Sequence, residues 1–152
     1  MGVEWANYFS PRPWLTFDAD LSLSSARFTD GDPAGTAIPG AVRQVASVGA
    51  SMSELHRLSG GLHIRYLGGR PLIEDATVNS RPSWIANVEG AYRIAPRARL
   101  FVDVLNVFDS RSSDIDYYYP SRLAGEPAEG VNDVHTHPLQ PRTARLGIQL
   151  DF

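Results

Sequence analysis

Polar and apolar residues alternate with a period of two along most of this 152-residue chain, and this alternation restricts the folds open to it. In the run LTFDADLSL, Leu15, Phe17 and Ala19 occupy every second position, and Thr16 and Asp18 lie between them. Because successive side chains of a strand point to opposite faces, such a run predicts a β-strand with one apolar face. Five further runs alternate in the same way and cover residues 41–53, 58–68, 84–94, 99–108 and 143–152.

A seventh, shorter run surrounds Val3 and Trp5 near the start of the chain. The run at 99–108 is less regular than the others, because Phe101 and Leu105 share a face with Asp103. No segment of useful length shows the 3.6-residue period of an amphipathic helix. The sequence therefore predicts an all-β chain, an antiparallel meander of six to seven strands.

The connections between these runs alternate strictly between short and long. If neighbouring strands pair, all short turns fall on one edge of the sheet and all long loops on the other. Outer-membrane barrels have this asymmetry, with short periplasmic turns and longer extracellular loops. The short connections are residues 9–13, 53–57 and 94–98. The long connections are residues 29–40, 68–82 and 109–141.

Composition excludes several classes of function. The 14 Lys and Arg residues against 17 Asp and Glu residues give a net charge of −3, which offers no basic surface for nucleic acid. The absence of cysteine excludes disulfides and thiolate metal sites. Without a phosphate loop, a nucleotide fingerprint or a Gly-x-Ser-x-Gly motif, we expect neither an enzyme nor a cofactor. The first residues lack the basic segment and apolar stretch of a signal peptide, so we expect none there, and no apolar run approaches the roughly 20 residues of a membrane helix.

The alternation is compatible with two kinds of protein, a soluble sandwich and a membrane barrel, and periodicity alone does not decide between them. In a soluble sandwich the apolar faces would meet in a core. In a membrane barrel they would face lipid, and the polar faces would line an interior. The apolar faces mix small residues such as Ala46, Ala50 and Ala86 with large ones, and the polar faces carry charges at mid-strand, which favours the barrel. The residues expected to face its lumen are Asp18, Asp20, His63, Arg65, Glu89, Asp103 and Arg145.

Three segments carry a family likeness. In LFVDVLNVFDS, a strand runs into Asn106, Phe108 and Asp109 before a loop, and in IPGAVRQVASVGASM an Ile-Pro pair precedes a strand. The closing strand alternates up to the terminal aromatic residue, after the long loop that contains YYYPSRLAGEP. Together these segments resemble the TonB-dependent outer-membrane receptors. The closing strand of this chain is similar to the signal that the barrel assembly machinery reads in such barrels. The residues that would form this signal are Leu146, Ile148, Leu150 and Phe152.

The resemblance implies that residues 1–152 are the C-terminal portion of a receptor barrel in a Gram-negative outer membrane. A family member has an N-terminal plug, a TonB-binding box and 22 strands, so we expect this chain to lack those parts and not to fold or transport alone. The implied function is active uptake of a bulky nutrient such as a ferric siderophore, cobalamin or a glycan. The implied partners are outer-membrane lipid, the barrel assembly machinery and, through the plug, TonB. The alternatives are a soluble β-sandwich binding module and a plug-less outer-membrane porin.

Two sets of residues in the last long loop are candidate ligand contacts. Consecutive tyrosines offer rigid contact area to a substrate, although they equally suit a β-hairpin whose side chains pair across strands. A His-x-His spacing is loose for zinc, which takes three or four protein ligands, so we expect no metal site there. The substrate candidates are Tyr117, Tyr118, Tyr119 and Arg122. The weak metal candidates are Asp133, His135 and His137.

Overall fold

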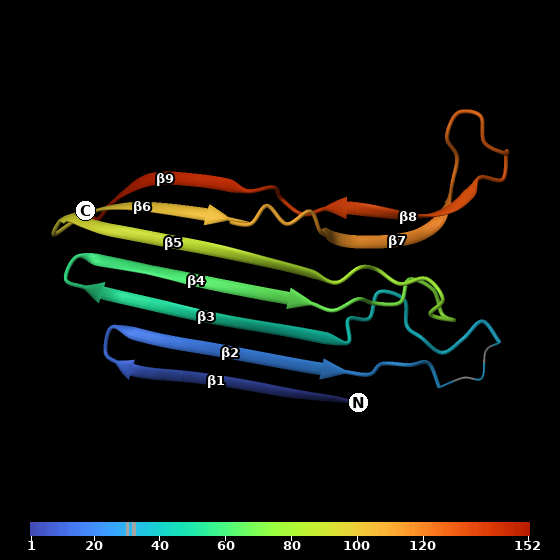
Figure 1. Ribbon diagram of the computed structural model, residues 1–152, viewed down its shortest axis with the longest axis horizontal. Coiled ribbons are helices and arrows are strands. Elements are labelled where there is room, and N and C mark those ends of the chain that lie inside the picture. Colours follow the sequence, from blue (N-terminus) through green and yellow to red (C-terminus); the bar gives the residue numbers. More distant parts are fainter. Residues whose placement is uncertain (30, 32) are drawn as a thin grey trace.

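The structure of the chain is a computed structural model that describes residues 1–29, 31 and 33–152. The described residues form nine β-strands (Figure 1). They include no helix that is long and apolar enough to cross a membrane. The strands are β1 (Gly2–Arg12), β2 (Leu15–Ser24), β3 (Gln44–Leu55), β4 (Leu58–Leu67), β5 (Ser83–Ala95), β6 (Ala98–Leu105), β7 (Ser113–Ser121), β8 (Val131–Pro138) and β9 (Thr143–Leu150).

Seven strands form one antiparallel sheet in the order β1-β2-β3-β4-β5-β6-β9, while β7 and β8 pair separately. This confirms the predicted meander. The first strand extends well beyond the alternating run near Trp5, because β2 pairs with it along its length. Within that extension Asn7 lies opposite Ala19 on the apolar face and Tyr8 lies opposite Asp18 on the polar face. Those two exchanged residues break the alternation, so only the pairing defines the full strand.

All short turns lie on one edge of the sheet and all long loops on the other (Figure 1). The short turns join β1 to β2, β3 to β4 and β5 to β6, and the register shifts just before each turn. Such bulges increase the local twist of a strand. The predicted alternation of connections is therefore confirmed. The long loops span residues 25–43, 68–82 and 106–142; residues 30 and 32, part of the first predicted loop, lie outside the described residues.

The strand register sorts the side chains of the seven-stranded sheet into two faces. Register brings Asp18 and His63 onto one face and places Asp103 between Glu89 and Arg145 on the same face. The other two residues expected to face a lumen also lie there, because Asp20 and Arg65 flank a common partner in β3. We call this side the polar face.

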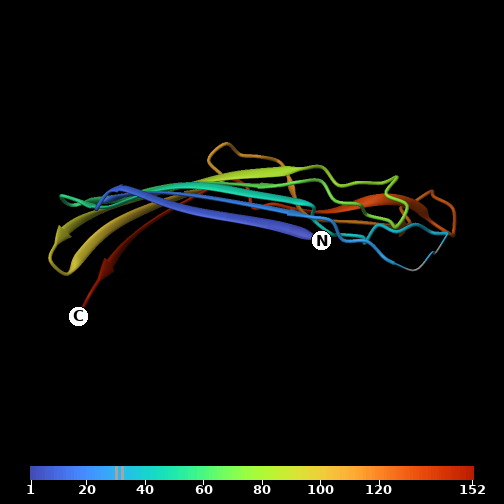
Figure 2. The ribbon, with the colours of Figure 1, turned by 90° about the horizontal axis from the view of Figure 1, so that it is seen from below.

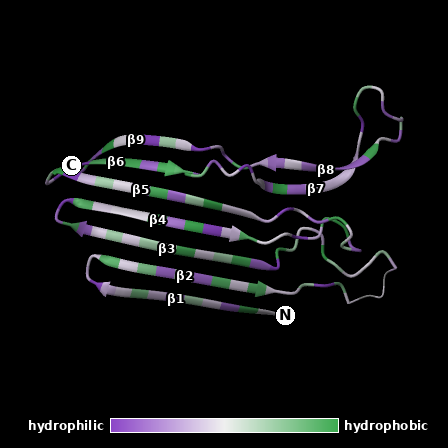
Figure 3. Cartoon of the chain, in the orientation of Figure 1, coloured by the Kyte–Doolittle hydropathy of each residue, from purple (hydrophilic) through white to green (hydrophobic). Residues whose placement is uncertain are grey.

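The opposite, apolar face runs across all seven strands and is uncovered. Figure 3 shows the alternation of hydropathy along the strands. Val48, near the centre of the sheet, is 50% exposed, and Ile148 is 61% exposed. In the described part of the chain, the buried hydrophobic residues are Ala37, Leu72 and Ala86. A soluble sandwich would bury the apolar rows against a second sheet, whereas Figure 2 shows a single curved layer.

Candidate functional site at the long-loop edge

The first two long loops pack on each other and form a platform, which we define as residues 35–41 and 68–80. The Gly40 amide donates to the Pro71 carbonyl at 2.8 Å, and the Ala37 amide donates to the Glu74 carbonyl at 2.9 Å. Gly35 has a φ of 123°, and a Cβ there would lie 2.2 Å from the Glu74 oxygen, so this close approach requires glycine. The platform is therefore an ordered surface next to the sheet edge.

Asp75 fixes a turn at the tip of the platform. Its Oδ1 accepts hydrogen bonds from the backbone amide and the hydroxyl of Thr77, each at 2.8 Å. The backbone bond, and after it the hydroxyl bond, lowers the pKa of Asp75 below the ordinary aspartate value of 3.8. Ala76 has a φ of 57°, and its carbonyl accepts a hydrogen bond from the Asn79 side chain. These local bonds hold the turn closed.

The tyrosine segment forms the hairpin β7–β8, which lies beyond the long-loop edge of the sheet (Figure 1). The cross-strand partner of Tyr117 is His135, and that of Tyr119 is Asp133, so the tyrosines pair with β8 rather than with one another. The Tyr119 and His135 rings stack, with centroids 3.9 Å apart and planes 15° apart. Tyr117 and Tyr119 are about half exposed. The hairpin therefore presents an aromatic face to solvent.

A cavity of about 480 Å³ separates the hairpin from the platform. This volume falls in the range of small-molecule sites, about 300–1,000 Å³. Arg70 supplies the cation of its lining: Nη2 lies 3.7 Å from Asp116 Oδ2 and donates to the Asp114 carbonyl at 2.9 Å. Neither Arg70 nor Asp116 was predicted from the sequence, since a polar loop residue and a strand aspartate carry no separate signal there. The lining comprises Pro39, Gly40, Arg70, Leu72, Asp114, Ile115, Asp116, Tyr117, Tyr118 and Tyr119.

The cavity includes only part of the predicted ligand set. Arg122 lies outside it, in the turn after β7, where Nε donates to the Glu126 carbonyl at 3.2 Å. Asp133, His135 and His137 occupy alternate positions of β8, with neighbouring members of the set about 7 Å apart along the strand. Within the described ranges, no three His, Cys, Asp or Glu residues are grouped as metal ligands would be.

The motif residue Asn106 forms a buried junction where β6 ends. It is 1% exposed and has a φ of 51°, a conformation that asparagine tolerates better than most residues. Its Nδ2 donates to the carbonyls of Ser110 and Gln140 at 3.1 and 3.0 Å, and its Oδ1 accepts from the Ser110 amide at 2.8 Å. Its own amide donates to Asn87 Oδ1 at 2.9 Å. The side chain thus joins both ends of the last long loop.

The other motif residues act at the same edge. Asp109 Oδ1 accepts a hydrogen bond from the Arg142 amide at 3.1 Å, across the base of the loop. The Phe108 ring lies 5.5 Å from that of Trp84, on the apolar face. The family-like motif therefore builds the junction between the sheet and its last long loop.

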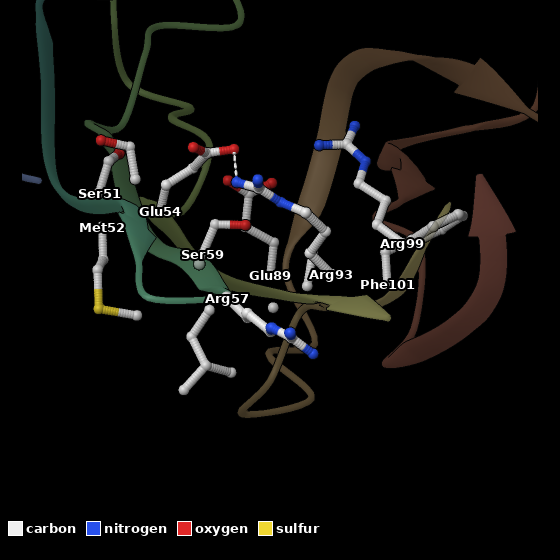
Figure 4. A pocket seen from close by; sticks show the side chains of 14 residues that line it. Ser51, Met52, Glu54, Arg57, Ser59, Glu89, Arg93, Arg99 and Phe101 are labelled. Atoms are coloured by element: carbon white, nitrogen blue, oxygen red, sulfur yellow. Dashed lines mark ion pairs between the residues drawn. The ribbon is translucent and has the colours of Figure 1, made fainter. Parts of the chain in front are cut away.

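A second concavity of about 470 Å³ lies on the polar face beside the short turns (Figure 4). Figure 4 shows the Glu54 and Arg93 side chains forming an ion pair there. Arg99 instead donates to Gln149 Oε1, through Nε at 2.9 Å and Nη2 at 2.6 Å. Arg57 also lines this groove. Glu54, Arg93 and Arg99 thus have partners within the sheet.

The seven polar-face residues form no ion pairs among the described residues. Asp20 Oδ2 accepts a hydrogen bond from the Ser47 hydroxyl at 3.0 Å. The Asp18 carboxylate lies over Gly49, where a Cβ would be 2.3 Å from Oδ1. Glu89 lies directly opposite another carboxylate in the next strand. That this face lines a lumen stays a prediction.

The four residues of the expected assembly signal lie at the free edge of the sheet. Leu146, Ile148 and Leu150 are 73, 61 and 55% exposed on the apolar face of β9. Phe152 lies beyond the end of β9 and is fully exposed. These side chains are therefore available to another molecule.

Neither the models of known families nor the curated proteins include a match to the chain. Solved structures do match. The ferric-catecholate import receptor Fiu from E. coli K12, in its closed form, superposes with a TM-score of 0.72 at 21% identity over 99% of this chain and 20% of its own. The ferric yersiniabactin uptake receptor FyuA from Yersinia pestis superposes with a TM-score of 0.75 at 19% identity, over 99% of this chain and 23% of its own. For the siderophore receptor PiuA from Acinetobacter baumannii the TM-score is 0.74 at 14% identity, over 98% of this chain and 21% of its own.

The chain thus spans about a fifth of the length of the receptors that it matches. These neighbours are TonB-dependent outer-membrane receptors of Gram-negative bacteria. At the identities observed, the likeness concerns the fold, and it agrees with the meander, the alternating turns and loops and the uncovered apolar face. The resemblance expected from the sequence is confirmed at this level: the chain has the fold of a barrel segment of the TonB-dependent receptors.

Proposed function

We propose that the chain is the C-terminal barrel segment of a TonB-dependent receptor that takes up a ferric siderophore across a Gram-negative outer membrane. The observation that carries the proposal is the uncovered apolar face. From Leu58 to Tyr66, the apolar positions of β4 cover about 27 Å at about 3.4 Å per residue, comparable to the roughly 25 Å apolar band of outer-membrane barrels. In water such a face would be an aggregation surface, whereas in lipid it is the expected surface.

Aromatic residues near both edges of the sheet support a position across a membrane. Tyr66 pairs with Trp84 towards the long-loop edge, and the Trp84 ring contacts Phe108. Phe9 pairs with Phe17 towards the short-turn edge. Two aromatic girdles of this kind mark the interfaces of a membrane barrel. With short turns on the periplasmic side, the long loops and the tyrosine hairpin face outward and can meet the substrate first.

Three structural neighbours, a ferric-catecholate, a ferric yersiniabactin and a siderophore receptor, favour a ferric siderophore over cobalamin or a glycan as the substrate class. In this proposal Tyr117, Tyr118 and Tyr119 contact the substrate, while Arg122 stabilises the turn after β7 through its hydrogen bond to the Glu126 carbonyl. The polar face meets the plug domain, through which TonB delivers energy. The exposed β9 residues and Phe152 engage the barrel assembly machinery.

Uptake of radioactive iron tests the proposal. In the bacterium that makes the intact protein, deletion of its gene should abolish uptake from at least one of a panel of ferric siderophores, and uptake should require the inner-membrane proton gradient. Serine at positions 117–119 should lower that uptake with the protein still in the outer membrane. The matched control is Glu129→Gln, in the exposed tip of the same hairpin, which should leave uptake unchanged. Unaltered uptake of every siderophore after deletion would contradict the proposed function.

A further inference from the structure

Among the described residues, hydrogen bonds and an ion pair hold the hairpin β7–β8 to the rest of the chain at two places. The first is its neck, where the Leu139 amide donates to the Ser112 carbonyl at 3.0 Å and the buried Asn106 side chain binds Ser110 and Gln140. The strands of the hairpin join no ladder of the seven-stranded sheet. The neck can therefore act as a pivot.

The second attachment is the single side chain of Arg70. It reaches from the platform to β7, where it meets the Asp116 carboxylate and the Asp114 carbonyl. The Arg70 and Asp116 side chains are 11% and 4% exposed, so the ion pair is shielded from solvent. Both contacts are made by Nη2, and the planar guanidinium holds the two N–H bonds of that atom in fixed directions. One side chain thus joins two points of the strand to the platform.

We propose that Arg70 is a positioning residue that latches the tyrosine hairpin onto the platform through Asp116 and so sets the width of the cavity between them. A buried charge that loses its partner is strongly destabilised, because it is left without compensation away from water. Loss of either partner leaves the other as such a charge, so water enters between Arg70 and β7, and β7 turns about its neck. Because Tyr117, Tyr118 and Tyr119 follow Asp116 directly, the same motion displaces the tyrosines. The role of the cavity rests on the proposed function; the latch does not.

The latch is tested by double electron–electron resonance, which measures the distance between two spin labels on the protein. This chain contributes no cysteine, and any cysteine elsewhere in the intact protein is first replaced by serine. Asn132→Cys in β8 and Arg81→Cys in the loop 68–82 then place one label on the hairpin and one on the platform side. The measurement uses the intact protein in outer-membrane vesicles without substrate. With Arg70 and Asp116 present we expect a single short distance. Asp116→Asn, which keeps the size but removes the charge, should add a longer distance.

Two further variants separate the charge from mere packing. Asp116→Glu keeps the charge but enlarges the side chain, and the short distance should persist. If only shape held the hairpin, the asparagine variant would keep the short distance and the glutamate variant would lose it. The control is Asp133→Asn, which removes the same charge from β8, away from the platform, and should change nothing. A short distance retained by Asp116→Asn overturns the latch.

A variant at the other partner covers the case in which Asp116→Asn fails to assemble. Arg70→Gln should then give the longer distance and Arg70→Lys should retain the short one. Equal distances in those two variants and the unaltered protein overturn the latch. Because no substrate is present, a failed latch and a failed uptake proposal remain distinguishable. Uptake can be absent while the latch variants behave as expected, and the reverse also holds.

Discussion

Asn106 shows how one side chain can hold two distant segments together. Its amide group meets both ends of the last long loop, and its backbone lies in a region that few residues tolerate. The sequence marks this residue as part of a family-like motif but does not show its role, because Ser110 and Gln140 become neighbours only when β9 pairs with β6. Arg70 and Asp116 were unpredictable for the same reason, since they belong to different loops of the sequence.

Replacement of Asn106 by alanine should destabilise the folded protein by about 2–4 kcal/mol, because buried hydrogen-bonding groups lose their partners and alanine disfavours a positive φ. Asn106→Gly should cost less, since glycine accepts the backbone conformation. Urea unfolding of the intact protein in lipid vesicles measures both. Asn132→Ala, at an exposed position of β8, is the control and should stay within about 0.5 kcal/mol. An alanine variant as stable as the unaltered protein would refute a structural role for the junction.

The strands of the main sheet were largely predictable, because its two faces differ in polarity and this difference survives in the sequence as an alternation. Its exceptions follow from contacts between strands. Phe101 interrupts the polar face of β6 because its ring covers Gly147 of β9, where a Cβ would lie 2.4 Å from the Phe101 Cζ. The hairpin β7–β8 stayed only one of two interpretations, because Tyr117, Tyr118 and Tyr119 are consecutive and show no sorted faces.

Charged substitutions on the two faces of β3 should differ sharply in cost. Val48 lies near the centre of the apolar face and Ser47, its neighbour at similar depth, lies on the polar face. Lysine at position 48 should destabilise the protein by about 2–4 kcal/mol, the cost of a cation at the bilayer midplane. Lysine at position 47 forfeits one hydrogen bond to Asp20 and lies between that carboxylate and the Arg65 guanidinium, whose opposite effects on the new charge offset each other. We therefore expect a cost below about 1 kcal/mol. Urea titrations in vesicles measure the difference, and equal costs would argue against a lipid-facing side.

At the scale of the whole molecule, the main feature is an open sheet with two unpaired edges, β1 and β9. Because neighbouring strands are antiparallel and the sheet has seven of them, the edge strands β1 and β9 run in the same direction. Fully antiparallel closure therefore requires an odd number of further strands, of which the first and the last run opposite to β1 and β9. A second copy in the same orientation supplies seven strands, but its edge strands run parallel to β1 and β9. The matched receptors, of which this chain spans about a fifth, have ample length for those strands. Unpaired backbone groups at both edges would be costly in lipid. In a membrane this sheet therefore needs further strands that pair with β1 and β9.

A tryptophan placed on each face should report which side meets lipid in the intact protein. Leu62→Trp and His63→Trp put the probe at the same depth of β4, on the apolar and the polar face respectively. Every native tryptophan of the intact protein, Trp5, Trp14 and Trp84 among them, is first replaced by phenylalanine. Lipids brominated in their acyl chains should quench the fluorescence of the first variant strongly and of the second little, because bromine quenches at contact. Iodide in the water should quench in the opposite order if the polar face lines a hydrated interior. Equal insensitivity of both probes to brominated lipid would mean that the apolar rows are buried in protein, and a membrane barrel would then be the wrong interpretation.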